Sequence, residues 1–158
     1  RSSVEKFEAE AIGTVVENEL RGCLLQWGVA VMVEGGKQPR IGISKPGAEL
    51  LDRLRGLTLR HPHDVKHAQV FLAYLSREAP VDLSWLMGMC ELATKRRRPS
   101  AAKSQFSHWG GKHAADAAGA YLSRAREWGL IHPTSNPYQL TQFGEKMYDQ
   151  YRRFVHEV

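Results

Sequence analysis

One pattern occurs twice in this chain, and it constrains the fold more than any other feature. Residues 24–55 (LLQWGVAVMVEGGKQPRIGISKPGAELLDRLR) parallel residues 125–152 (AREWGLIHPTSNPYQLTQFGEKMYDQYR). In each segment a helical pattern ends in Trp-Gly, and strand-like residues then flank a turn. A Ser or Thr, with a Gly three residues after it, starts another helical pattern. A repeat of this length predicts two copies of one helix–hairpin–helix unit.

The landmarks of the repeat match at two offsets. Trp27-Gly28 pairs with Trp128-Gly129 at an offset of 101 residues, whereas Ser44 pairs with Thr141 at an offset of 97, because the first hairpin is four residues longer. A glycine after a helix lets the chain turn away, and Ser or Thr caps the next helix. Any helix–hairpin–helix gives some similarity of this kind, but two landmark pairs in register favour a genuine repeat.

The second half of the chain carries the signals of a complete domain. Aspartate or threonine stands where three of its helices would begin, and proline or glycine stands where two would end. Two strand-like segments around a polar, proline-bearing tip predict a hairpin at 130–140. The expected order is helices at about 64–78, 82–95 and 112–128, then the hairpin, then a closing helix from 141.

The stretch Tyr121–Gly144 (YLSRAREWGLIHPTSNPYQLTQFG) resembles winged helix-turn-helix transcription regulators of the MarR and PadR types. Their pattern is a recognition helix, an apolar residue with Gly-Leu-Ile/Val, a short hairpin, then Leu-Thr and a Gly three residues after the Thr. The resemblance implies a winged helix-turn-helix domain over 59–158, mainly α with short β-hairpins (α+β), that binds double-stranded DNA. The chain departs from it between Arg96 and Gly111, where those regulators have a tight turn. Either the recognition helix is displaced or this loop adds a contact.

Residues 1–58 are expected to hold a truncated copy: a helix over about Val4 to Trp27, a hairpin and a helix. No preceding helices would cover the apolar stripe of that first helix, so we expect it to pack on the second domain, on another copy in a homodimer, or on a partner protein. Otherwise the missing helices lie upstream of Arg1, since a chain that does not begin with Met suggests a fragment or a processed product. The stripe consists of Val16, Leu20, Leu24 and Trp27.

Positive charge is concentrated in the second half. Residues 1–58 hold eight Lys or Arg and eight Asp or Glu, whereas residues 59–158 hold fourteen and nine. No acid lies between Glu91 and Asp116, and six Lys or Arg do. Such a segment favours a polyanion such as nucleic acid, although a solvated, charged loop would look the same.

The candidate DNA contacts fall into three groups. Phosphates would be held by the basic segment, base edges would be read from the loop and the outward face of the third helix, and the hairpin would reach the minor groove. That helix has no outward Arg or Asn early on, and the hairpin has no Arg or Lys, so both are weakly equipped. The candidates are Lys95, Arg96, Arg97, Arg98 and Lys103 for phosphate, Gln105, Ser107, His108, Lys112, His113, Asp116 and Ser123 for bases, and His132, Ser135 and Asn136 in the hairpin.

Other motifs lack the partners that their chemistry would need. His61, His63 and His67 lie close in sequence, but zinc needs three or four convergent ligands, so capping and surface roles fit them better. Ser100-Ala-Ala-Lys103 lacks the companion motifs of the Ser-x-x-Lys enzymes. We therefore expect no catalytic residue, no metal and no cofactor.

The two cysteines, Cys23 and Cys90, are too few for a disulfide framework and fit buried thiols in a reducing compartment. No apolar run approaches the roughly 18 residues that a membrane span needs, and no signal segment opens the chain. The expected localisation is cytoplasmic, and nucleoid-associated if the source is bacterial.

Two functions remain open. The first is a DNA-binding protein with tandem winged helices, either a transcription regulator or a protein resembling the initiators of plasmid replication. The second is a winged-helix module that contacts protein, as a subunit of a larger complex that handles nucleic acid. The uncovered apolar stripe, the neutral first half and the weakly equipped recognition helix favour the second.

Overall fold

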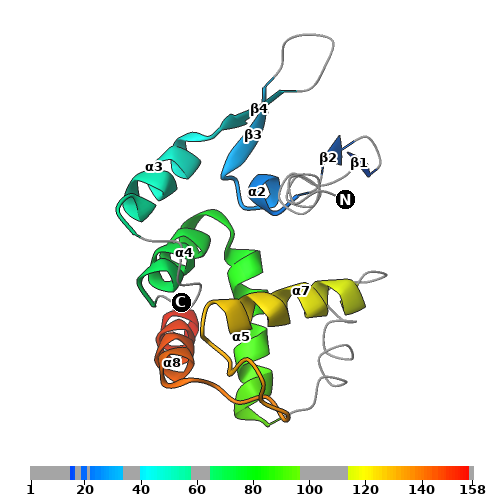
Figure 1. The fold of residues 1–158 in the computed structure, drawn as a ribbon, viewed down its shortest axis with the longest axis vertical. Coiled ribbons are helices and arrows are strands. Elements are labelled where there is room, and N and C mark those ends of the chain that lie inside the picture. Colours follow the sequence, from blue (N-terminus) through cyan, green and yellow to red (C-terminus); the bar gives the residue numbers. More distant parts are fainter. Residues whose placement is uncertain are drawn as a thin grey trace. The chain divides into compact units, whose positions relative to one another are not determined.

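The computed structural model describes residues 15–16, 19–20, 22–33, 40–57, 65–96 and 114–156 (Figure 1). These parts are mainly helical with small antiparallel sheets, which confirms the expected α+β class. The helices are α2 (Cys23–Gln26), α3 (Lys45–Leu54), α4 (Val65–Glu78), α5 (Pro80–Thr94), α7 (Ala114–Glu127) and α8 (Gln142–His156), and the strands are β1 (Val15–Val16), β2 (Glu19–Leu20), β3 (Ala30–Val33) and β4 (Arg40–Ile43).

The chain divides into two compact units. Unit 1 comprises Arg1–Gly56 and Val70–Pro80, and unit 2 comprises Leu57–Gln69 and Val81–Val158. The second half of α4 therefore belongs with the first part of the chain. Tyr74 on this half of α4 shows the packing, because its buried hydroxyl donates a hydrogen bond to the Trp27 carbonyl at 3.0 Å.

The predicted helix over about Val4 to Trp27 is wrong at residues 15–16 and 19–20. There β1 pairs antiparallel with β2, and only α2 is helical among the described residues of that range. Adjacent β-branched residues at 15 and 16 favour a strand over a helix. The predicted stripe is consequently not the face of one helix: Val16 and Leu20 lie in strands, and Trp27 is buried within unit 1.

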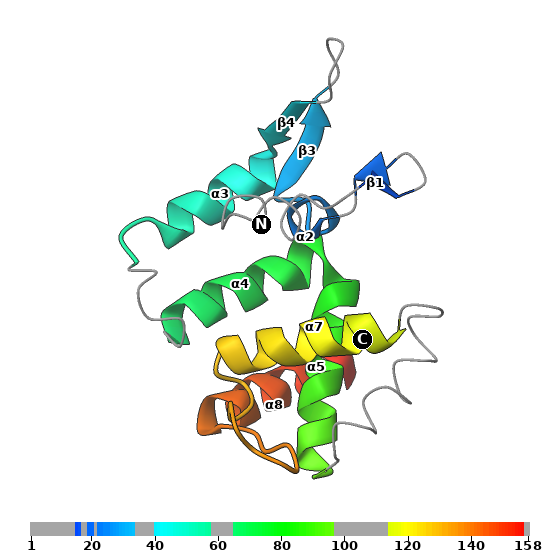
Figure 2. The same ribbon diagram turned by 45° about the vertical axis from the view of Figure 1, so that its right-hand side comes forward.

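Unit 2 is built around α5, most of whose side chains are buried. Figures 1 and 2 show α7 crossing α5. Tyr121 joins the two helices, since its hydroxyl donates a hydrogen bond to the Asp82 carboxylate and its ring meets Trp85 edge-on at 5.2 Å between centroids. Leu130 and Ile131, which follow α7, are fully buried.

The junction between hairpin and following helix in unit 1 is made by one serine and two glycines. The Ser44 hydroxyl accepts a hydrogen bond from the Gly47 backbone N–H at 2.9 Å and donates one to the Gly28 carbonyl. Gly28 has a φ of +69°, a conformation that L side chains rarely adopt. A Cβ on Gly47 would lie 2.0 Å from the Val29 carbonyl oxygen, so α3 approaches the hairpin too closely for any side chain there.

Unit 2 repeats this junction contact by contact. The Thr141 hydroxyl accepts from the Gly144 backbone N–H at 2.9 Å and donates to the Gly129 carbonyl. Gly129 has a φ of +68°, and a Cβ on Gly144 would lie 1.9 Å from the Leu130 carbonyl oxygen. The two segments aligned by sequence thus have the same hydrogen bonds at the same positions.

The two hairpins differ in what surrounds this shared junction. In unit 1, β3 and β4 pair over four residues each. In unit 2 the predicted strands at 130–132 and 138–140 are reduced to a single bridge between Ile131 and Leu140, supported by a hydrogen bond from His132 to Gln139 at 2.9 Å.

Candidate nucleic-acid interface

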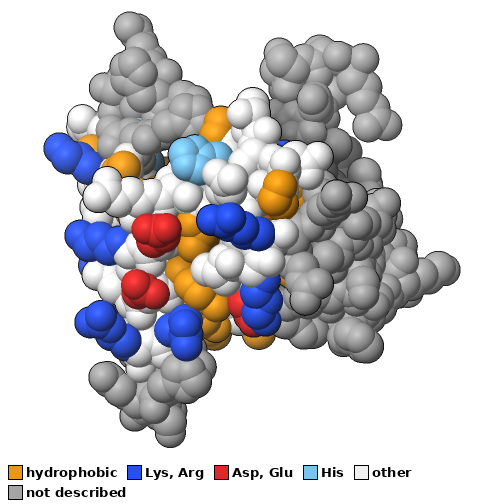
Figure 3. All heavy atoms as spheres, turned by 90° about the horizontal axis from the view of Figure 1, so that it is seen from below, with side chains coloured by type: hydrophobic (Ala, Val, Ile, Leu, Met, Phe, Trp, Pro, Cys, Tyr) orange, Lys and Arg blue, Asp and Glu red, His pale blue; other side chains and the backbone are white. Residues whose placement is uncertain are grey.

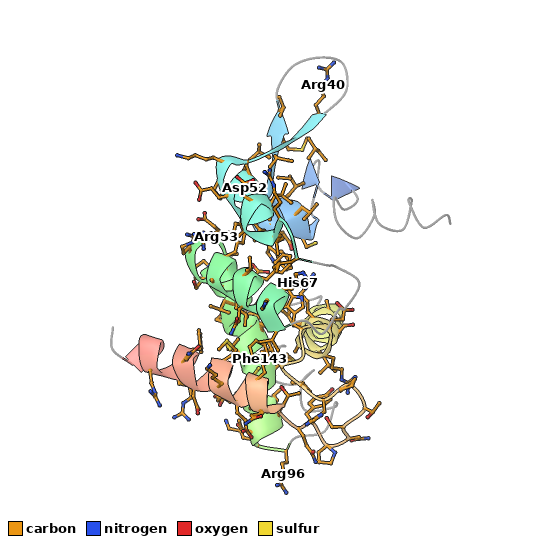
Figure 4. All side chains as sticks on the ribbon, turned by 60° about the vertical axis from the view of Figure 1, so that its left-hand side comes forward. Arg40, Asp52, Arg53, His67, Arg96 and Phe143 are labelled. Carbon is orange, nitrogen blue, oxygen red and sulfur yellow. The ribbon has the colours of Figure 1, made fainter. Side chains whose placement is uncertain are left out.

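The basic segment begins where α5 ends. Arg96 has a φ of +46°, a left-handed conformation that turns the chain out of the helix, and its N–H bonds to the Ala93 carbonyl at 3.0 Å. Its side chain is exposed and lies at the end of α5 (Figure 4). Lys95 forms an exposed ion pair with Glu91, so its charge is partly compensated. Of the two predicted phosphate contacts that are described, Arg96 is therefore the better placed.

A pocket of about 340 Å³ lies beside Arg96. The end of α5, the second hairpin and the first turn of α8 contribute to it. Glu145 adds a negative charge to the lining to which Arg96 adds a positive one, so the pocket itself is a poor phosphate site. The lining residues are Ala93, Thr94, Arg96, Gln139, Leu140 and Glu145.

The outward face of α7 carries small side chains and little charge. Ser123, one of the predicted base-reading positions, is exposed, and so is Ala120, three residues before it on the same helix. Ser123 lies 3.4 Å from the Glu127 carboxylate, which is exposed on the same face. This face offers small side chains, one hydroxyl and one carboxylate, which suits close approach to a groove better than selective readout.

Sequence reasoning passed over two arginines of α7, because they stand among the residues expected to pack rather than in the acid-free segment. Arg124 stacks over the Tyr121 ring at 5.6 Å, and Arg126 stacks over the Tyr138 ring at 5.4 Å. Both guanidinium groups are thus held against the body of unit 2 rather than on its outward face. The three-residue spacing of Tyr121 and Arg124 on one helix could have predicted their contact, whereas the contact of Arg126 with Tyr138 joins the helix to the hairpin and cannot be read from sequence spacing.

The second hairpin presents His132 and Asn136 as exposed side chains. The third predicted residue, Ser135, uses its hydroxyl within the hairpin. It donates to the His132 carbonyl at 3.2 Å and accepts from the Gln139 N–H at 3.1 Å. His132 and Asn136 are therefore the hairpin's available polar groups among the three predicted.

The other predicted contacts lie outside the described residues, except that Asp116 has a described backbone in α7. Figure 3 shows that Lys and Arg side chains are interspersed with Asp and Glu on the described surface seen from below. The described surface seen in this view is therefore of mixed charge rather than uniformly positive. The predicted contacts not described are Arg97, Arg98, Lys103, Gln105, Ser107, His108, Lys112 and His113.

The remaining candidates have mixed outcomes. Burial raises the pKa of the Cys90 thiol to about 12, in keeping with a buried, unreactive cysteine, whereas Cys23 is only half-buried. The expected surface position of His67 is wrong, since only 7% of this residue is exposed. His61 and His63 lie outside the described residues.

Two further results bear on classification. No helix in the described parts of the chain is long and apolar enough to cross a membrane. No protein-family model, no curated protein and no solved structure matches this chain.

Proposed function

We propose that residues 59–158 form a winged helix-turn-helix domain that binds double-stranded DNA, and that residues 1–58 carry a truncated copy of it. The order of α4, α5, α7, a short hairpin and α8 supports the winged-helix assignment. The repeated Ser44 and Thr141 junctions support the tandem arrangement, because unrelated helix–hairpin–helix segments have no reason to share the same two hydroxyl hydrogen bonds at the same positions.

The basic segment carries the proposal for DNA. It starts at the exposed Arg96, contains no acid before Asp116, and leads into α7, the helix that a winged helix places in the major groove. Phosphate contacts from this segment would set affinity, while the weakly charged face of α7 would add little sequence choice. The function that fits is a DNA-binding regulator or replication initiator whose affinity for DNA comes mainly from contacts with the DNA phosphates.

Salt dependence of DNA binding tests this proposal. Duplex binding by the full chain is measured by fluorescence anisotropy at several salt concentrations, beside Arg96/Arg97/Arg98→Ala. Each phosphate contact contributes about 0.9 to the slope of log affinity against log salt, so the triple variant should lower that slope by roughly 2–3.

A second triple variant provides a matched control. Arg40/Arg53/Arg55→Ala removes the same charge from exposed positions of unit 1 and should change the slope by less than about one. Absence of binding at about 50 mM salt, or an equal loss of slope in both variants, contradicts the proposal.

The second candidate is a winged-helix module that contacts protein within a larger nucleic-acid-handling complex. One observation favours it: the β3–β4 hairpin of unit 1 exposes large apolar side chains, which a DNA-contacting wing does not need. Val31, Met32 and Val33 are each 44–45% exposed. This surface and DNA binding by unit 2 are compatible in one protein.

A further inference from the structure

The β3–β4 hairpin exposes apolar positions that the equivalent hairpin of unit 2 covers. Tyr138 is 0% exposed in unit 2, and Leu140 is half-buried. Their repeat equivalents in unit 1, Ile41 and Ile43, are 38% and 63% exposed. The same structural positions are therefore core in one unit and surface in the other, and the exposed pair needs an explanation beyond the fold of a single chain.

Three of the exposed side chains, those of Met32, Ile41 and Ile43, share one face of the hairpin, whereas Val31 and Val33 lie on the other face. Met32 lies directly opposite Ile41, and Ile43 lies opposite Ala30, and opposed residues of an antiparallel pair point to the same side. On the strands themselves, the only charged residue among the described positions is Arg40, at the far end of β4 (Figure 4). A polyanion finds little to bind here, whereas an apolar, uncharged strand fits well.

The outer edge of β4 can accept such a strand. Ser44 donates its N–H to the Val29 carbonyl at 3.0 Å, and hydrogen-bonded pairs alternate along an antiparallel ladder. Gly42 therefore bonds toward β3, while the backbone groups of Ile41 and Ile43 point away from it. In the described ranges this sheet has two strands, with α2 contacting β3. Within β4 there is no proline or bulge, and its single charge, Arg40, stands at one end, so the rest of this edge is a template for another strand.

We propose that this edge pairs with the same edge of a second copy of the chain, giving a four-stranded sheet across a two-fold axis at Gly42. The outward-pointing groups are two residues apart, so Ile41 bonds with Ile43 of the partner subunit, and the reverse pair forms by symmetry. Arg40 then faces Ser44 of the partner subunit, and no like charges meet. The strand is complementary to itself in hydrogen bonding and apolar face, and its one charge meets no like charge.

The oligomeric state of the full chain tests this dimer, and the test does not depend on DNA. Sedimentation equilibrium at about 100 μM should give twice the chain mass of 17.8 kDa. Ile43→Lys places a charge opposite Ile41 of the partner subunit and should weaken dimerisation at least about ten-fold. Val81→Lys is the control, since Val81 on α5 is also 63% exposed but lies outside the hairpin; it should shift the dimer constant by less than about two-fold.

Circular dichroism melting establishes that both variants fold, as their exposed positions lead us to expect. A monomeric wild type at about 100 μM overturns the proposal. So does a dimer that survives Ile43→Lys, or one that Val81→Lys weakens equally, because either would place the interface elsewhere. A failure to bind DNA would not contradict the dimer. Absence of the dimer would not contradict DNA binding by the basic segment, which the salt experiment tests separately.

Discussion

The closest approaches in the two junctions occur at glycines, Gly47 in unit 1 and Gly144 in unit 2. At each position a Cβ would lie about 2 Å from a backbone carbonyl oxygen, which cannot move as a flexible side chain could. Glycine is required here for space rather than for its backbone angles. Sequence comparison pairs these glycines, and the structure supplies the physical reason for the match.

We expect Gly144→Ala to destabilise the protein by about 1–3 kcal/mol, the usual range for forcing extra atoms into a packed site. Gly119→Ala is the control, because nothing lies within 4 Å of a Cβ on this exposed residue of α7. Replacing a helical glycine with alanine there should leave stability unchanged or raise it by about 0.5–1 kcal/mol. Urea denaturation measures both, and equal midpoints for the two variants would show that the close approach is not real.

At the scale of elements, α7 and α5 are joined by Tyr121. Its hydroxyl donates a hydrogen bond to the Asp82 carboxylate, and its ring contacts both Trp85 and Arg124. This arrangement fixes the orientation of the helix that we propose enters the DNA groove. These contacts of Tyr121 are therefore a structural requirement of the candidate site, although none of the residues that make them is expected to touch DNA.

Tyr121→Phe should lower the free energy of unfolding by about 1.5–3 kcal/mol, since it removes a hydrogen bond to a charged group that is partly buried. Tyr151→Phe, on α8, is the control. Tyr151 makes no hydrogen bond to the described residues, so removing its hydroxyl should change the free energy of unfolding little. Chemical denaturation compares the pair. If both cost the same, the Asp82 contact does not hold α7 in place.

Helices with strong periodicity and clear end signals could be predicted from sequence. The expected helix at about 64–78 is found as α4, Val65–Glu78, because its apolar spacing and the Pro80 after it leave few alternatives. At Val15 and Val16 the sequence predicts a helix, because apolar residues recur there at a helical spacing. In the structure these residues form a strand that pairs with β2. Short hairpins compete with helices on terms that spacing alone does not capture.

At the scale of the whole molecule, the sequence suggests a domain boundary near residue 58. In the structure the division falls within α4 instead, because Val70–Pro80 belongs to unit 1 and Leu57–Gln69 belongs to unit 2. Nothing in the composition of Val70–Pro80 marks it as belonging with unit 1, because the buried Tyr74 hydroxyl and Trp27 carbonyl are 47 residues apart. Long-range partners of this kind are not encoded in local patterns. The same limit applies to the candidate site, where exposure of Arg96 was predictable and the internal use of Ser135 was not.

The most direct test of the central claim is hydrogen–deuterium exchange of the full chain with and without duplex DNA at about 50 mM salt. The proposal predicts slower exchange over residues 95–113 and the first turns of α7, with β3 and β4 unchanged. Unchanged exchange over 95–127 with DNA bound, or protection confined to residues 30–43, would contradict the assignment of DNA binding to the basic segment of unit 2.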